Sequence, residues 1–245
     1  MAILTLNRPE ARNAMTFGMY ERLAEICRSF DPAGPVRALI ITGAGEKAFA
    51  AGTDISQFRE FSSADDALAY EARIEDVLTA IETCPVATIA AISGACTGGG
   101  AGIAAACDLR IATASLKFGF PIARTLGNCL SIANYARLAA MMGSGRVMDL
   151  IFTARLVGAD EAKAIGAISE IVEDHAALMQ RARALADTLA GHAPLTLRAT
   201  KEALRRIRNG ERKGSDLIAM CYTSADFREG LEAFLGKRPP NWTGA

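Results

Sequence analysis

The chain has 245 residues, 51% of them hydrophobic, so it can bury the core of one large domain. Its 27 basic and 27 acidic side chains cancel, which argues against a nucleic-acid or anionic-membrane surface as the main binding partner. The N-terminus lacks a signal-peptide pattern and no apolar run reaches the roughly 18–20 residues of a membrane-spanning helix, so we expect a cytoplasmic protein.

Strands and helices alternate through the first part of the chain. Short apolar runs predict strands at 2–6, 37–42 and 86–92. Helical spacing predicts one helix from the N-cap residue Thr16 to about residue 30, and another over 67–83.

Two segments interrupt this alternation. Residues 48–54 (AFAAGTD) are almost all small, and residues 56–66 (SQFREFSSADD) are polar and charged. The second composition predicts a mobile surface segment.

The second part of the chain becomes helical. Further strands are predicted at 108–113, 116–119 and 167–172, with irregular chain at 121–128. Helices are predicted at 130–142, 145–153, 159–165, 176–190, 195–208 and 214–223, before a tail over 224–242. This order predicts an α/β core over residues 1–190 with right-handed crossovers, followed by a helical C-terminal region over 191–245.

The six cysteines are scattered and none forms a CxxC pair, which weakens a metal or redox interpretation. Most of them stand beside apolar residues, which is typical of buried free thiols in a reducing compartment. We therefore expect no metal site.

Residues 86–110 (VATIAAISGACTGGGAGIAAACDLR) predict a buried strand, a glycine-rich turn and a tightly packed helix. Such a turn can bring backbone N–H groups to a negatively charged oxygen, because glycine has no Cβ to keep a ligand away. A close helix–strand crossing would need the same small residues. At this point both interpretations remain open.

Two other chemistries fit poorly. A dinucleotide-binding turn needs an acidic residue about 20 positions further on, but no Asp or Glu lies between Asp108 and Asp149. A nucleophilic triad lacks both a G-x-S-x-G elbow and a well-placed histidine, since His175 and His192 lie among polar residues near late helices.

Residues 50–54 (AAGTD) and 96–100 (CTGGG) can each present a free backbone N–H, and two such donors at one point form an oxyanion hole. Around these segments the chain resembles the enoyl-CoA hydratase/isomerase (crotonase) superfamily. The resemblance covers seven stretches: LNRPEARNAM (6–15), KAFAAGTDI (47–55), ISGACTGGGAGIAAACDLRIA (92–112), FGFP (118–121), TARLVGADEAKAIGAISEIV (153–172), APLTLRATKEAL (193–204) and SADFREGLEAFLGKRPPNW (224–242).

The resemblance implies a crotonase-like spiral of ββα units, a helical trimerisation region, and a homotrimer or a dimer of trimers. It implies an acyl-CoA substrate, with coenzyme A as part of the substrate and no other cofactor. The N–H groups of Thr53 and Gly99 would form the oxyanion hole. The implied substrate-binding residues are Ala11, Arg12, Ala14, Ala51, Asp54, Ile55, Ala95, Gly98, Pro121, Ile122, Phe234 and Lys237.

The chain departs from the pattern of true hydratases, which carry two glutamates that activate and deliver water. Gly102 occupies the first position and Ile122 the second. Since each acid–base group typically contributes about 10²–10⁴-fold to the rate, the resemblance predicts an enzyme that forms a thioester enolate but hydrates poorly. The alternative is an acyl-CoA-binding protein that has lost its chemistry.

Other side chains could supply the acid or base. Cys129 falls near a position where some family members place an Asp nucleophile or an isomerase acid, although a buried packing thiol is an equally good interpretation. By the same resemblance, Glu60, Tyr70 and Glu71 lie in or near the segment that flanks the acyl pocket. Arg124 and Asn128 could line that pocket.

Overall fold

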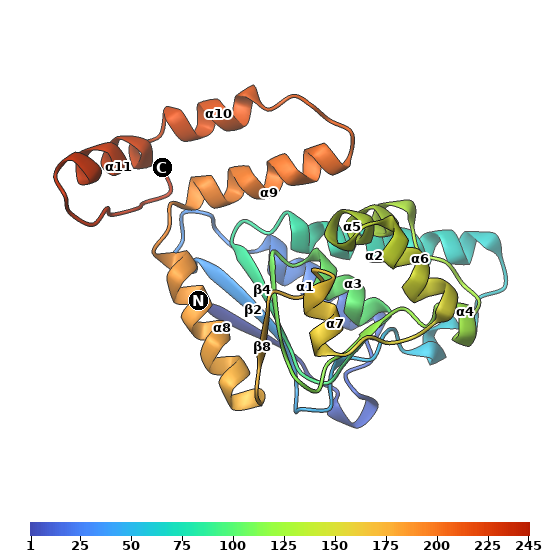
Figure 1. Cartoon of the computed structure of the whole chain (residues 1–245). Helices are drawn as coiled ribbons and strands as arrows, with labels where there is room; N and C mark the ends of the chain where they lie inside the picture. The colour runs from blue at the N-terminus through green and yellow to red at the C-terminus, as the bar shows by residue number, and fades with distance from the viewer.

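The computed structural model describes residues 1–245 and has two parallel sheets at its centre (Figure 1). The larger sheet has the order β1-β2-β4-β6-β8, and the smaller has the order β3-β5-β7. The strands are β1 (Ala2–Leu6), β2 (Ala38–Gly43), β3 (Ala48–Ala50), β4 (Ala87–Ile92), β5 (Ala95–Thr97), β6 (Leu109–Thr113), β7 (Lys117–Gly119) and β8 (Glu170–Val172). The predicted α/β class is confirmed.

The two sheets are formed by a strand–strand–helix unit that repeats along the chain. A long strand of the larger sheet is followed by a short strand of the smaller sheet and then by a helix. The helices that close these units are α2 (Ala64–Glu82), α3 (Gly99–Ala106) and α4 (Ile122–Thr125). The result is the expected spiral of ββα units.

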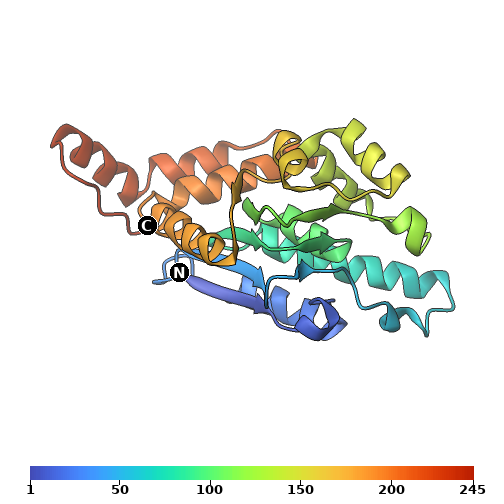
Figure 2. The same ribbon diagram turned by 60° about the horizontal axis from the view of Figure 1, so that its bottom comes forward.

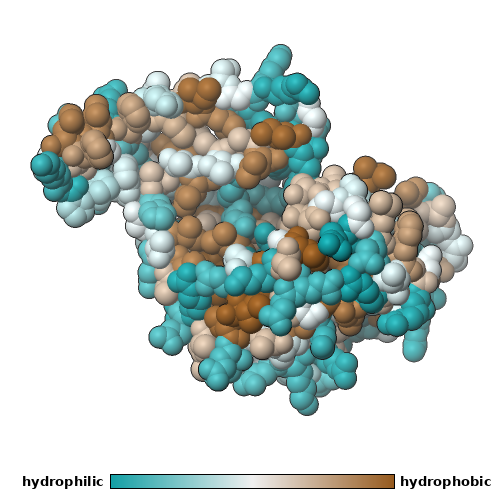
Figure 3. Space-filling model, in the orientation of Figure 1, coloured by the Kyte–Doolittle hydropathy of each residue, from teal (hydrophilic) through white to brown (hydrophobic).

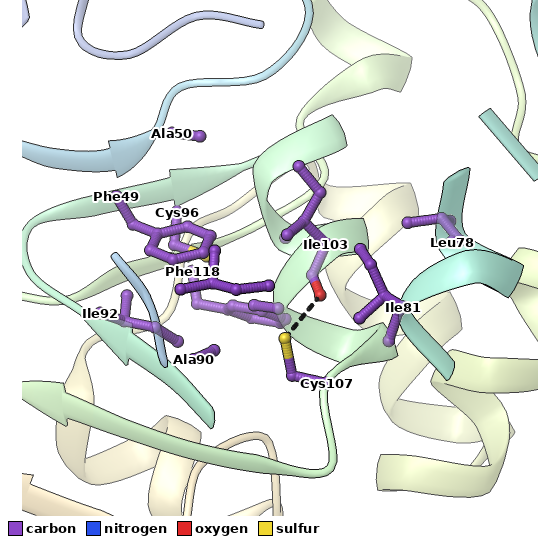
Figure 4. Close-up of a cluster of buried hydrophobic side chains, with 14 of the residues drawn as sticks. Phe49, Ala50, Leu78, Ile81, Ala90, Ile92, Cys96, Ile103, Cys107 and Phe118 are labelled. Carbon is purple, nitrogen blue, oxygen red and sulfur yellow. Dashed lines mark hydrogen bonds between the residues drawn. The ribbon is translucent and has the colours of Figure 1, made fainter. Parts of the chain in front are cut away.

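The main hydrophobic core lies between the two sheets and these helices. Figure 4 shows Phe49 of β3 and Phe118 of β7 packed beside Ile92 of β4 and Ile103 of α3. β2 and β4 are buried along their whole length, as expected for strands of a parallel sheet that is covered on both faces.

Helix α8 (His175–Ala190) covers the other face of the larger sheet (Figure 1). Its buried Leu178 and Ala182 pack against Ile40, Ile89 and Ile111. The other segments of the core are η1 (Pro9–Ala11), α1 (Phe17–Arg28), η2 (Ile55–Phe58), α5 (Ile132–Met142), α6 (Ser144–Thr153) and α7 (Ala159–Ala164).

The C-terminal helices form an arm that extends from the core. Figures 1 and 2 show α9 (Pro194–Arg208), α10 (Ser215–Tyr222) and α11 (Ala225–Leu235) on one side of the molecule, with α11 at the far end. The chain then turns back, and the buried Asp226 accepts hydrogen bonds from the N–H groups of Thr243 and Gly244 at 2.7 and 2.9 Å. Apolar side chains gather along the arm (Figure 3), and the exposed ones include Leu204, Ile207, Ile218, Tyr222, Leu231 and Phe234.

The structure differs from the sequence-based elements in several places. The tail expected over 224–242 contains α11, which begins because the Ser224 hydroxyl accepts a hydrogen bond from the Phe227 N–H at 2.9 Å. Strands β3 and β5 and the single turn α4 also escaped prediction, because three or four residues rarely show a period. None of the helices has both the length and the apolar composition that crossing a bilayer requires.

Candidate active site

The glycine turn leads from β5 into α3, and two of its glycines have different structural roles. Gly98 has φ of 52°, a conformation that favours glycine. At Gly100, an added Cβ would overlap the carbonyl oxygen of Ala50 and lie 2.7 Å from the Ala50 Cβ. The close-crossing interpretation therefore holds at Gly100. Gly99 is also closely approached, because an added Cβ would overlap the Tyr20 hydroxyl and lie 3.2 Å from Thr53 Oγ1.

The turn that follows β3 meets this glycine turn. A Cβ at Gly98 would lie 3.6 Å from the Cα of Gly52, and a Cβ at Gly52 would lie 3.9 Å from the nitrogen of Gly99. Among the hydrogen bonds of turns and loops, none uses the N–H of Thr53 or of Gly99. Two backbone donors are thus free at adjoining turns, which is the arrangement that an oxyanion requires.

The segment around η1 lies beside the turn that follows β3, which contains Gly52 and Thr53. The N–H of Ala51 donates to the carbonyl of Arg12 at 3.1 Å, and the N–H of Met15 donates to the carbonyl of Gly52 at 2.8 Å. The structure therefore brings together Ala11, Arg12, Ala14, Ala51, Asp54 and Ile55, which the resemblance assigned to coenzyme A. The Asp54 carboxylate already accepts a hydrogen bond from Arg8 at 3.0 Å.

Thr53 also anchors a chain of three hydroxyl groups. Its Oγ1 lies 3.0 Å from the hydroxyl of Tyr20 on α1 and 2.8 Å from the hydroxyl of Tyr70 on α2. Burial raises the pKa of both tyrosines, so both hydroxyls stay protonated. Sequence analysis missed Tyr20 because nothing in its helix pattern distinguishes it from a core residue, and it gave no role to the Thr53 side chain.

We expect Tyr20→Phe to lower the free energy of unfolding by about 0.5–1.5 kcal/mol, because one buried hydrogen bond is lost while Thr53 keeps its bond to Tyr70. Urea unfolding followed by circular dichroism measures this change. Tyr222→Phe is the matched control, because Tyr222 is exposed. Equal stability of Tyr20→Phe and the wild type would show that the hydroxyl chain contributes nothing to stability.

Beyond the two turns that contain Thr53 and Gly99, α3 faces α2 and α5. A Cβ at Gly102 would lie 3.7 Å from both Leu78 Cδ1 and Asn134 Nδ2, so this position has room for a side chain. Asn134 is buried, and its Oδ1 has no hydrogen-bond partner. Sequence analysis missed Asn134, and the only signal was an amide residue within an amphipathic helix pattern.

The segment around β7 lies against the glycine turn and β5. The N–H of Gly98 donates to the carbonyl of Gly119 at 3.0 Å, which holds the FGFP segment and Pro121 against the glycine turn. Ala95 in β5 pairs with Lys117 in β7. Ile122, which the resemblance assigned to the second glutamate position, is buried in the main core.

The other candidate side chains are less well placed. Cys129 is exposed in the loop between α4 and α5, so the expectation of a buried packing thiol is wrong. Glu60 and Arg124 are also exposed. Glu71 on α2 is half-buried, and burial raises the pKa of its carboxyl.

Phe234 and Lys237 lie at the end of α11, where Phe234 is exposed. Figures 1 and 2 both place α11 at the far end of the arm, away from α3. Within one chain these two residues do not reach the glycine turn.

A cavity of about 630 Å³ is also remote from the glycine turn. It lies between α9 and the C-terminal end of α3, where Ala106, Cys107 and Lys201 are among its lining residues. The glycine turn lies at the opposite end of α3.

The whole chain, residues 1–245, matches the family model described as enoyl-CoA hydratase/isomerase. The chain belongs to the enoyl-CoA hydratase/isomerase family. It is 32% identical over 243 residues to the short-chain-enoyl-CoA hydratase of Clostridium acetobutylicum, covering 97% of this chain and 92% of that one. It is also 32% identical to the crotonyl-CoA hydratase of Syntrophomonas wolfei, with 99% and 94% covered.

Solved structures of family members agree with the fold. An enoyl-CoA hydratase/carnithine racemase from Magnetospirillum magneticum superposes with a TM-score of 0.90 at 33% identity, covering 99% of this chain and 92% of that one. The enoyl-CoA hydratase of Bacillus anthracis superposes with a TM-score of 0.86 at 32% identity, with 99% and 95% covered.

Proposed function

We propose that this family member acts on an acyl-CoA thioester and stabilises its enolate between the N–H groups of Thr53 and Gly99. The observation that supports this proposal is the meeting of two turns in which the N–H groups of Thr53 and Gly99 have no partner within the chain. The thioester carbonyl oxygen gains negative charge as the α-proton leaves, and fixed N–H dipoles stabilise that charge. Removing one such donor from other enzymes costs about 3–4 kcal/mol of barrier.

The proposed enzyme hydrates 2-enoyl thioesters poorly. Gly102 and Ile122 stand at the positions that the resemblance assigns to the two hydratase glutamates, and neither side chain can hold or move a proton. Enolate formation followed by return of the proton is therefore the favoured reaction class. The proposal needs no cofactor beyond the coenzyme A of the substrate.

We also propose a trimeric assembly in which Phe234 and Lys237 approach the coenzyme A bound by a neighbouring subunit. The exposed apolar side chains along the arm support this proposal, since a second copy would remove them from water. Lys237 would meet a phosphate of coenzyme A through its charge.

Mass spectrometry of acyl-CoA thioesters incubated with the protein in heavy water tests the proposed reaction. The panel contains saturated, 2-enoyl, 3-enoyl and dicarboxylic thioesters. We expect deuterium at the α-carbon of at least one thioester, with little addition of water to the 2-enoyl compound. Rapid hydration would contradict the role given to Gly102 and Ile122, and binding without any change would favour an acyl-CoA-binding protein that has lost its chemistry.

A further inference from the structure

We propose that Glu71 is the catalytic base of this site and that its carboxylate carries the α-proton of the bound thioester. This inference deepens the proposed function and rests on it, because the enolate must be held at Thr53 and Gly99. Glu71 stands at neither hydratase position. Its assignment depends on which face of α2 meets α3 and α5.

One face of α2 looks into the space beside Gly102. Residues 71, 75 and 78 recur at helical spacing, so their side chains share this face. Leu78 faces the open position at Gly102, and Glu75 accepts a hydrogen bond from the Ser131 hydroxyl of the α5 N-cap at 3.3 Å. Glu71 therefore lies one turn further toward the N-terminus of α2, on the face that borders this space.

The neighbouring residue ties this part of α2 to the oxyanion turn. Tyr70 bonds Thr53 Oγ1 at 2.8 Å, and its ring packs edge-on against Phe58 with 4.8 Å between the ring centroids. The first turns of α2 are thus fixed beside the residue whose N–H would hold the oxyanion. After burial, the charge of Glu71 also contributes to raising the pKa of Tyr20 and of Tyr70.

Glu71 is the carboxylate on this face that remains free. Glu75 is held by Arg137 through a bond of 2.7 Å, and Glu82 further along α2 is held by Arg208 at 2.8 Å. Among the carboxylates of α2, Glu75, Asp76 and Glu82 form ion pairs, whereas Glu71 forms none. Burial raises its pKa, the Ser131 N–H lowers it, and the charge of Glu75 raises it, with a net upward shift. A carboxyl with a raised pKa is both a stronger base and a usable acid near neutral pH.

The proton balance is simple. A Glu71 carboxylate oxygen takes the α-proton, the C–H electron pair becomes the enolate double bond, and the thioester oxygen carries the negative charge. The Glu71 carboxylic acid exchanges its proton with solvent and then returns a proton to the α-carbon. When the substrate is a 3-enoyl thioester, the enolate is a dienolate, and the proton can return to the γ-carbon instead. The step needs no oxidant, metal or second substrate.

The test measures α-deuterium exchange of the most reactive thioester with wild type, Glu71→Gln and Asp65→Asn. Asp65 is exposed on the same helix, so its variant removes one charge from α2 without touching the site. We expect Glu71→Gln to lose about 10²–10⁴-fold in exchange rate, with the wild-type Kd for the thioester and the wild-type melting temperature. Asp65→Asn should exchange as the wild type does.

Exchange by Glu71→Gln at the wild-type rate would overturn the assignment and leave the enolate proposal standing. Absence of exchange in the wild type would instead remove the proposed function itself. The pH profile of the wild type gives a second readout that does not depend on any variant folding. Exchange should rise with pH through an inflection above the usual carboxyl range, because the unprotonated form is the base, and an inflection within that usual range would argue against Glu71.

Discussion

Gly100→Ala should damage the site strongly, because the added methyl group would meet backbone atoms of β3. Its Cβ would overlap the Ala50 carbonyl oxygen and approach the Ala50 Cβ to 2.7 Å. Both atoms belong to or adjoin the backbone of β3, so neither can rotate away. The start of α3 must therefore move off β3, which separates the N–H of Gly99 from that of Thr53.

We expect Gly100→Ala to lower the free energy of unfolding by about 1–3 kcal/mol, the usual cost of overpacking a well-filled core. We expect α-deuterium exchange to fall by about 10²–10³-fold, as when one oxyanion donor is lost. Urea unfolding and the exchange assay measure the two effects.

Gly102→Ala is the matched control on the same helix. Its Cβ would meet Leu78 and Asn134 at 3.7 Å, an ordinary contact distance. Alanine is the better helix former by about 1 kcal/mol, so this variant should be at least as stable as the wild type. If the two alanine variants unfold alike, the close approach at Gly100 does not constrain the turn.

Arg137→Met should cause the largest loss of stability away from the turns. The Arg137 side chain is 2% exposed and joins α5 to two carboxylates of α2. The Arg137 guanidinium donates a hydrogen bond to the Glu75 carboxylate. Its Nε also forms an ion pair with the Glu82 carboxylate at 2.9 Å, but the Nε–H has no hydrogen-bond partner. Arg208 of α9 also binds Glu82, so the cluster connects the arm to the core.

We expect Arg137→Met to cost about 3–5 kcal/mol, because removing one partner leaves buried charge without compensation. Thermal and urea unfolding measure this loss. The control is Arg155→Met: Arg155 is 36% exposed and pairs with Asp149 and Glu161, so we expect its loss to cost no more than about 1 kcal/mol. Similar losses for both variants would contradict the importance of burial.

The Arg137–Glu75 ion pair also predicts how the free energy of unfolding changes at low pH. Burial raises the pKa of Glu75, but the hydrogen bond from Arg137 outweighs burial and the net pKa is lowered. A lowered pKa contributes stability above the ordinary carboxyl pKa, and this contribution is lost as the pH falls through the folded-state pKa. Arg137→Met should therefore show a smaller acid-induced loss of stability than the wild type.

The family and the order of elements could be predicted from the sequence because their signals are local. Apolar runs marked β1, β2 and β4, and Thr16 marked the start of α1 by accepting a hydrogen bond from the Met19 N–H. Seven motifs in order indicated the family, which the whole-chain match confirms. Segments of three or four residues, such as β5 and α4, were missed because pairing or packing elsewhere in the chain stabilises them.

By itself, the sequence determined the α/β class, the glycine-rich turn and the absence of glutamate at residues 102 and 122, since these follow from residue type and spacing. Only the tertiary structure decided which side chains meet. The Tyr20–Thr53–Tyr70 chain joins residues from three separate elements, and Glu71 is distinguished from Glu75 only because Arg137 holds the latter. Contacts between residues so distant in sequence depend on how the helices pack on the sheets, and that packing leaves no period in the sequence.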